Sequence, residues 1–323
     1  MISVEQSKEQ SKEQRQKKRK EHYGEAVVKA ETGPRISQVE INSVLEQAKL
    51  RMRDEMVLRE LGLRGILGAE HLARLCYVGA PTEGEKGKRS RFGQLVALGL
   101  LAWSARGSKQ YYYWLTKLGI AVLRAQGIEV KAANLANTQH SLLAADFMVA
   151  VLEEARYFGA DASWQSEIEL GSWKAAVRPD AGGRFSLIGG KLEFAVEIDR
   201  RTMSETRIKK KVAGYEQERK AGRVATQVLL VTSAGEKALP YLCKAVREAR
   251  LSANTPITWF ITSFERLGRY VGVLGGEYYG PLTAPVWLRP EGGEPISMVP
   301  AQVRQQALAS RANNKALATA ATA

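Results

Sequence analysis

The feature that most constrains the fold of this chain is a change of apolar period between residues 43 and 125. Apolar residues recur at spacings of three and four, as on the buried face of a helix, over 43–61, after Gly68 and again over 88–99. Two strand-like segments follow, LLAWSA and QYYYWL, joined by an Arg-Gly-Ser turn, and Thr116 then stands in capping position before another helix. Helix, helix, basic helix and β-hairpin is the order of a winged helix-turn-helix, in which the third helix enters the DNA major groove and the hairpin lies on the phosphate backbone.

The basic residues of this segment fall where such a domain would touch DNA. Residues 68–135 hold ten basic and four acidic residues, and six of the ten crowd the start of the third helix or bracket the hairpin turn. A solvated helix end beside a loop is the alternative, but clustering at both elements favours contact with DNA. The DNA-contacting residues that we expect are Lys86, Lys88, Arg89, Arg91, Gln94, Arg106, Ser108 and Lys109.

The composition agrees with a folded protein that meets a polyanion. The chain has 323 residues, 45% of them hydrophobic, which suffices for two ordinary domains, and its formal charge of +14 indicates nucleic acid or an anionic membrane surface as partner. Cys76 and Cys243 lie far apart in apolar runs, and the lack of a Cys-x-x-Cys pair argues against structural zinc. The longest apolar runs fall short of the roughly 18 residues that span a bilayer, and no segment is typical of a secretion signal. We therefore expect a cytoplasmic protein without a membrane partner.

The two ends of the sequence differ in composition from its middle. Residues 1–35 contain a tandem SKEQ repeat and a basic cluster with almost no apolar residue, which is typical of a disordered basic arm. The stretch 300–323 is rich in Ala, Asn and Thr and carries no acid, so we expect a disordered tail. Between them, the sequence predicts a winged helix-turn-helix domain over 40–132 and an α/β domain over 137–290.

From Asn137 onward, the periods predict this second domain. A long helix begins at Asn137 or Thr138 and ends near Gly159, with His140 in its first turn at a surface or interdomain position. Helices, strands and glycine turns then give the order α-β-β-β-α-β-α-β, which is typical of an α/β domain with a mixed sheet. The chain as a whole is therefore expected to be of the α+β class.

Three acids stand at strand ends of the second domain. Asp180 follows Pro179 before a Gly-Gly turn, and alternation along LEFAVEID puts Glu197 and Asp199 on the same side of their strand. Converging carboxylates suit a hard divalent cation such as Mg²⁺, which activates water for attack on a phosphodiester. The alternative is that the acids pair with neighbouring arginines or with lysines of the next helix, where Lys211 lies at the edge of the buried stripe and can point back toward them.

These segments resemble a known family. YYYWLTKLG, NTQHSLLAADF and above all VRPDA, FAVEIDRRTMS and KKKVAGY are similar to the replication-relaxation family, which is encoded on plasmids and other mobile elements, and the resemblance covers roughly residues 45–265. Its most specific part is Arg178-Pro179-Asp180, Glu197-Ile198-Asp199, Thr202, and Lys211 with Tyr215. The resemblance implies a role in plasmid replication or in relaxation of plasmid DNA, and a second half that is similar to the PD-(D/E)xK nuclease fold.

The resemblance also implies roles for individual residues. On the nuclease pattern, Asp180 and Glu197 match the metal-binding acids, and Glu167 matches an additional acid that such nucleases often have. The chain departs from the pattern at Asp199, which stands where a lysine is expected two residues after Glu197. Lys211 is then the candidate for the missing cation, and Mg²⁺ is implied as a cofactor only if the site is intact. The implied catalytic set is Asp180, Glu197, Asp199 and Lys211.

Three functions remain open at this point. The first is a DNA-binding protein of a plasmid or mobile element, whose winged helix contacts double-stranded DNA. The second is a Mg²⁺-dependent endonuclease or nickase, and the third is a non-enzymatic assembly factor that recruits replication or mobilisation proteins. The first needs only the charge distribution, whereas the second also needs a complete site. Palindromic recognition would further imply a homodimer, with the expected helix at 43–61 as its interface.

Overall fold

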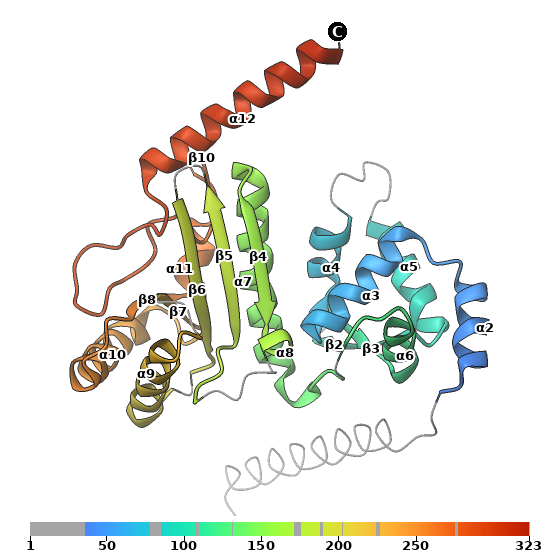
Figure 1. Ribbon diagram of the computed structural model, residues 1–323, viewed down its shortest axis with the longest axis horizontal. Helices are drawn as coiled ribbons and strands as arrows, with labels where there is room; N and C mark the ends of the chain where they lie inside the picture. Colours follow the sequence, from blue (N-terminus) through green and yellow to red (C-terminus); the bar gives the residue numbers. More distant parts are fainter. Residues whose placement is uncertain are drawn as a thin grey trace, which may run out of the picture.

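The computed structural model of the chain shows two domains joined side by side (Figure 1). It describes residues 36–77, 85–106, 110–130, 132–170, 176–187, 190–201, 203–223, 227–274 and 277–322, with the backbone alone at 85–90, 106, 168, 274 and 313–322. The expected basic arm at 1–35 lies outside the described residues.

The first domain has the element order and the sheet of a winged helix-turn-helix. Helices α3, α4 and α5, with α2 before them, precede a β-hairpin, and the short first strand adds to the hairpin to give an antiparallel sheet in the order β1-β3-β2. The helix before the hairpin and both hairpin strands match the expected segments closely. The elements are α2 (Gln38–Ala48), α3 (Met52–Arg64), β1 (Leu67–Gly68), α4 (Ala69–Cys76), α5 (Glu85–Ala97), β2 (Leu101–Arg106), β3 (Gln110–Leu115) and α6 (Lys117–Ala125).

The expected single helix at 43–61 is wrong, because the structure has α2 and α3 in its place. Lys49 ends α2 in the left-handed conformation, with φ of 39°. The backbone N–H of Arg51 then donates to the carboxylate of Asp54 at 2.7 Å, which begins a new helix. The apolar side chains Val57 and Leu61 are buried in the core of this domain, so they are not available to a dimer interface.

Aromatic packing and a glycine fix the hairpin against its neighbours. The ring of Phe92 on α5 lies 5.2 Å from that of Tyr113 on β3. Thr116 caps α6 as expected, since its hydroxyl accepts from the N–H of Gly119 at 3.1 Å. A Cβ at Gly119 would lie 2.3 Å from the carbonyl oxygen of Leu100, so only glycine lets α6 approach the hairpin this closely.

The second domain confirms the expected α-β-β-β-α-β-α-β order and its mixed sheet. The five strands lie in the order β4-β5-β6-β7-β8, with antiparallel pairing from β4 to β6 and parallel pairing from β6 to β8. The elements are η1 (Leu135–Asn137), α7 (Thr138–Phe158), β4 (Asp161–Ser166), α8 (Glu167–Leu170), β5 (Ala181–Leu187), β6 (Gly190–Asp199), α9 (Glu205–Lys220), β7 (Gln227–Thr232), η2 (Glu236–Ala238), α10 (Leu239–Ala253), β8 (Thr258–Ser263), α11 (Phe264–Tyr270), β9 (Gly272–Leu274), β10 (Glu277–Tyr279) and α12 (Ala301–Thr322).

Alternation along β6 separates the two faces of the sheet. Val196 and Ile198 point into the core that α7 shares, whereas Ala195 joins Ile208 and Val212 of α9 in a second core. Figure 1 shows the sheet between α7 on one side and α9 with α10 on the other. Residues of β6 with odd numbers therefore point toward α9, as the sequence predicts for Glu197 and Asp199.

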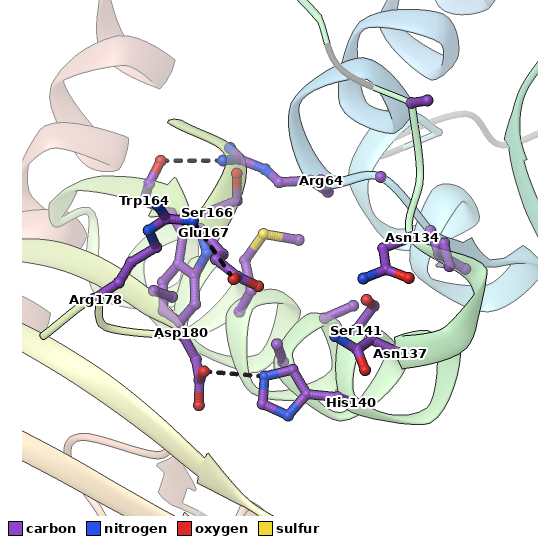
Figure 2. A pocket seen from close by; sticks show the side chains of 17 residues that line it. Arg64, Asn134, Asn137, His140, Ser141, Trp164, Ser166, Glu167, Arg178 and Asp180 are labelled. Carbon is purple, nitrogen blue, oxygen red and sulfur yellow. Dashed lines mark hydrogen bonds and ion pairs between the residues drawn. The ribbon is translucent and has the colours of Figure 1, made fainter. Parts of the chain in front are cut away.

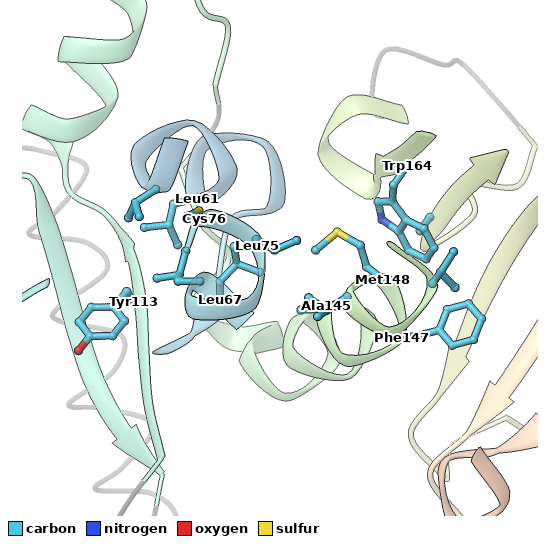
Figure 3. Close-up of a cluster of buried hydrophobic side chains, with 14 of the residues drawn as sticks. Leu61, Leu67, Leu75, Cys76, Tyr113, Ala145, Phe147, Met148 and Trp164 are labelled. Carbon is cyan, nitrogen blue, oxygen red and sulfur yellow. The ribbon is translucent and has the colours of Figure 1, made fainter. Parts of the chain in front are cut away.

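Helix α7 joins the two domains. Figure 3 shows Leu75 of α4 facing Ala145 and Met148 of α7, within one continuous hydrophobic cluster. Polar contacts flank this packing: His71 and Asp146 lie 2.7 Å apart, and the Arg74 side chain pairs with Glu153. Apolar burial of this kind is worth about 1.5–3 kcal/mol for each large side chain, so the domains are held together by more than their linker.

The expected disordered tail at 300–323 is wrong over 301–322, where the structure has helix α12. Ala has the highest helix propensity, and Ala307 is buried against the body of the protein. The Arg304 guanidinium lies 4.8 Å from the centre of the Tyr279 ring, and Arg311 donates to the carbonyl of Tyr157. No helix in the described part of the chain has the length and apolar character needed to cross a bilayer.

Candidate functional site

Glu197 is the centre of a buried polar group beneath α9. It lies near the end of β6, its side chain has no exposed surface, and Lys211 donates to its Oε2 atom. The hydroxyl of Tyr215 donates to Oε1 at 2.7 Å. Lys211 and Tyr215 are four residues apart on α9, so one turn of this helix brings both donors to the same carboxylate.

The charges of this group strongly affect one another. Burial and the negative charge of Asp180 raise the pKa of Glu197 to about 7, although Lys211 and Tyr215 oppose the shift. Burial lowers the pKa of Lys211, but the charges of Glu197 and Asp180 outweigh it and the net shift is upward. Burial and the charge of Glu197 raise the pKa of Tyr215 well above its ordinary value. Near neutral pH, Glu197 is thus the member of the group that can gain or lose a proton.

Asp180 joins the group from the start of β5, and His140 holds it. The backbone N–H of Ile198 donates to Oδ2 of Asp180 at 2.7 Å, and His140 Nε2 lies 3.1 Å from Oδ1. Burial lowers the pKa of His140, yet the hydrogen bond and charge of Asp180 outweigh it and raise the pKa. In turn, burial raises the pKa of Asp180, but His140 and Lys211 bring it below its usual value.

His140 is the residue that sequence reasoning undervalued. We expected it at a surface or interdomain position, and it is indeed the first-turn residue of α7 beside the domain junction. Its contact with Asp180 was not expected, because the two residues are forty positions apart and no second histidine or cysteine lies near either of them. The sequence feature that points to this contact is the place of His140 in the first turn of the helix that begins the second domain.

Asp199 has a structural role in place of the expected catalytic one. Its Oδ1 atom accepts from the N–H of Met203 at 3.0 Å, and its Oδ2 atom accepts from the hydroxyl of Thr232 at 2.7 Å. Arg201 in the same turn has a φ of 69°, a left-handed conformation that costs free energy and needs such support. Asp199 therefore shapes the turn from β6 to α9.

Glu167 and the other acids do not form the expected metal set. Glu167 begins α8 and does not lie on the preceding strand, and its half-exposed carboxylate is 4.0 Å from the guanidinium of Arg178. Both oxygens of Glu197 already accept from protein groups. In the described residues, no group of three or more His, Cys, Asp or Glu side chains is placed to hold a metal ion. The arrangement as it stands therefore does not fit Mg²⁺, and Lys211 supplies the positive charge next to Glu197.

Two hollows meet at His140 and Asp180. The first, of about 190 Å³, lies at the domain junction, and Figure 2 shows Asn134, Asn137 and Ser141 facing Glu167 and Arg178 across it. The second, of about 390 Å³, lies between the start of α7, the end of β6 and α9. The residues that line both hollows are Asn137, His140, Glu167 and Asp180.

In the winged helix-turn-helix, the half-buried side chain of Arg91 turns toward α3. Its guanidinium forms two hydrogen bonds with the buried carboxylate of Asp54, at 2.8 and 2.5 Å, and a third with Gln94 at 2.6 Å. Arg91 thus holds α5 to α3, which corrects its expected place at the DNA surface. Gln94 is exposed, as expected.

The other expected DNA contacts remain predictions. For Lys86, Lys88, Arg89 and Arg106 the structure describes the backbone alone, on α5 and at the end of β2. Ser108, Lys109 and Thr202 lie outside the described residues. Phe92 and Leu95 are buried on the packed side of α5, and Gly93 and Ala97 are exposed on another side of the same helix.

The sequence model of the replication-relaxation family matches residues 58–228, which is more than half of the chain. The chain belongs to the replication-relaxation family. The matched segment begins within α3 and ends within β7, so it contains the winged helix-turn-helix from the second half of α3 onward and the strands and helix that carry Asp180, Glu197 and Lys211. The family match therefore covers both regions in which we expect function.

Other comparisons add little to the family assignment. No curated protein shows significant sequence similarity to this replication-relaxation protein. A crystal structure of NadR in complex with 4-hydroxyphenylacetate aligns with 38% of the chain and 86% of its own length, at 15% sequence identity and a TM-score of 0.22. A TM-score this low does not establish a common fold.

Proposed function

We propose that this protein binds duplex DNA through its winged helix-turn-helix, in the replication or relaxation of a plasmid or other mobile element. Helix α5 would enter the major groove, and the β2–β3 hairpin would lie on the backbone. The role in replication or relaxation follows from the family. The winged-helix topology, with α5 as the helix directly before the hairpin, is the observation that carries the DNA-binding part.

The position of α5 supports this function. Phe92 and Leu95 are buried and fix one side of the helix on the domain, while Gly93, Gln94 and Ala97 leave another side open. The first turns of α5 carry Lys86, Lys88 and Arg89 in the sequence. The helix that is packed on the domain therefore also carries positive charge. Phosphate contacts from such residues dominate affinity for DNA and make it depend on salt.

The test is the salt dependence of duplex binding by the full chain. We expect Lys88→Ala combined with Arg89→Ala to weaken binding to a blunt duplex and to lower the slope of log affinity against log salt by about 0.9 for each lost phosphate contact. The matched control is Lys209→Ala with Lys220→Ala, which removes the same charge from α9, where both lysines pair with glutamates. An unchanged slope in the α5 variant, measured by fluorescence anisotropy, would remove α5 from the interface.

Cleavage of DNA is the second candidate function, and one observation favours it. Lys211 reaches Glu197 from α9, and its charge also acts on Asp180, so the cation that Asp199 fails to supply is present at the carboxylates. A lysine beside two acids matches the implied nuclease pattern with a displaced cation. The same contacts also fit a closed, inactive group, which is why we place binding first.

A nicking assay separates these two possibilities. Supercoiled plasmid is incubated with the full chain, with and without Mg²⁺ or Mn²⁺, next to the Asp180→Asn/Glu197→Gln variant. Nicking by the wild type alone would support an enzyme. No nicking under any of these conditions, with duplex binding intact, would exclude it. Circular dichroism of both proteins shows whether the variant has kept its fold.

A further inference from the structure

We propose that the two hollows form one groove that holds a single strand of DNA leading away from the duplex on the winged helix. We call it the junction groove; it comprises the hollow at the domain junction and the hollow beside α9. The inference rests on the proposed duplex binding, to which it adds a second nucleic-acid site on the other domain.

The two parts of the groove adjoin, because they share lining residues. Its first part reaches Arg64 and Asn134, next to the winged helix-turn-helix, and its second part reaches Lys210 on α9. His140 and Asp180 line both parts, so they mark the place where the two meet. A strand that leaves a duplex at the first domain would therefore find a path to α9 without leaving the surface.

The second part of the groove has positive charge that the protein does not use. The side chains of Arg200 and Lys210 line it, and neither makes an ion pair or hydrogen bond with any residue that the structure describes. Other cations of α9 are already paired, since Lys209 contacts Glu205 and Lys211 contacts Glu197. Cations that face a hollow without a carboxylate partner are suited to phosphate.

The start of α7 adds neutral polar groups at the meeting point. Asn137 is the N-cap residue of α7, but its side chain makes no capping hydrogen bond, and it lines both parts of the groove. Its amide is therefore available to a ligand. The 21-residue helix α7 also begins here, and the N–H groups of a helix start favour an anion.

The size of the groove selects a single strand over a duplex. The part beside α9, of about 390 Å³, is in the range of sites that enclose one small ligand, and the part at the domain junction is smaller, at about 190 Å³. The groove therefore has room for a few nucleotide groups and not for a double helix. The indole of Trp164 on its lining is buried, so it offers the bases no exposed ring to stack on. Recognition would thus be of the sugar-phosphate backbone, without sequence preference.

The experiment compares a blunt duplex with the same duplex carrying a single-stranded tail, both bound to the full chain. We expect the tail to increase affinity. Arg200→Ala combined with Lys210→Ala should weaken binding of the tailed duplex about ten-fold and lower the slope of log affinity against log salt by about 0.7 for each lost phosphate contact. Affinity for the blunt duplex should not change in this variant. Lys209→Ala with Lys220→Ala is the control of equal charge, and it should keep the gain from the tail.

A second variant separates binding from folding. Asn137→Asp puts a negative charge into the groove, where this charge repels the phosphates of a strand. The same charge stabilises the fold, because it lies at the start of a helix. We expect an unchanged or higher melting temperature together with a lost gain from the tail. Equal affinities of wild type and both groove variants for the tailed duplex would overturn the proposal.

The outcomes also distinguish the groove from the winged helix. Binding of the tailed but not of the blunt duplex would contradict the proposed duplex function and keep the groove, whereas binding of both with no gain from the tail would do the reverse. Inorganic phosphate tests the other source of the same chemistry. If phosphate at matched ionic strength raises the melting temperature of the wild type but not of the Arg200/Lys210 variant, and the tail adds no affinity, the site is one for free phosphate and the proposal is wrong.

Discussion

Helices α5 and α9 are both basic, and each gives one cation to a carboxylate buried beneath it, but the two carboxylates behave differently. On α5, Arg91 holds Asp54 through hydrogen bonds of 2.8 and 2.5 Å. Burial raises the pKa of Asp54, yet the hydrogen bonds from Arg91 and the backbone outweigh it and keep the pKa below its ordinary value. On α9, Lys211 holds Glu197, whose pKa rises to about 7.

The difference comes from the neighbours of each carboxylate. Burial acts on both, but Glu197 also feels the negative charge of Asp180, and its cation is a lysine. An arginine presents a planar pair of donors that matches a carboxylate, whereas a lysine is a point charge. Asp54 and Arg91 thus form an ion pair between α3 and α5 that stays charged near neutral pH, whereas the charge of the Glu197–Lys211 pair can change there.

The largest expected effect on stability is that of removing the Arg91–Asp54 ion pair. Arg91→Met keeps much of the apolar stem but leaves Asp54 buried without its cation. We expect the free energy of unfolding at pH 7 to fall by about 3–5 kcal/mol, the cost of an uncompensated buried charge. Urea unfolding measures it. Arg59→Met, at an exposed position of α3, should stay within about 0.5 kcal/mol. A loss of less than about 1 kcal/mol in the Arg91 variant would mean that the pair is not structural.

The corresponding change on α9 should cost less and should depend on pH. Lys211→Met leaves Glu197 without its cation, but this acid can take up a proton, so we expect a loss of about 1–3 kcal/mol at pH 7. Lys210→Met, the next residue, is the control and should leave stability unchanged.

The pH dependence has a definite sign. Because the pKa of Glu197 is raised from its ordinary 4.5 to about 7, the folded state keeps a proton that the unfolded chain has lost. This contribution to stability is complete below pH 4.5 and falls as the pH rises toward 7. Removal of Lys211 raises the pKa of Glu197 further. The difference in the free energy of unfolding between Lys211→Met and the wild type should therefore grow from pH 6 to 8. A difference that stays constant with pH would show that Glu197 does not titrate in this range.

The smallest effect is expected from the hydroxyl that completes the Glu197 group. Tyr215→Phe keeps the buried ring and removes one hydrogen bond, at a cost of about 1 kcal/mol. The loss of this donor should also raise the pKa of Glu197. We expect the pH-dependent part of unfolding to shift upward in the variant, less than it does in Lys211→Met. A loss as large as that of Arg91→Met would mean that Tyr215 acts through packing.

The sequence predicted the elements well wherever one period extends over a whole segment. The strand QYYYWL, the helix from Thr138 and the mixed sheet follow directly from alternation and from turn residues. The break at Lys49 did not, because the apolar period continues across it and the carboxylate of Asp54, which begins α3, looks like any surface acid. Helix α12 does not follow from the sequence in the same way, because a segment rich in Ala and Asn is typical of disorder, although Ala favours helix.

The candidate site was predictable in its acids but not in their partners. Alternation places Glu197 and Asp199 on one side of β6, and this is confirmed. Whether an acid caps a turn, as Asp199 does, or meets a cation, as Glu197 does, depends on contacts with residues far away in the chain. For the same reason the sequence could not show that Arg91 points inward.

The most direct test of DNA binding by the winged helix is hydrogen exchange of the full chain, alone and with bound duplex. We predict slower exchange in α5 and in the β2–β3 hairpin when a blunt duplex is bound, with little change in α10 and α12. A tailed duplex should extend the protection to the start of α7 and the turn from β6 to α9. Bound duplex that leaves exchange in α5 and in the hairpin unchanged would contradict the account.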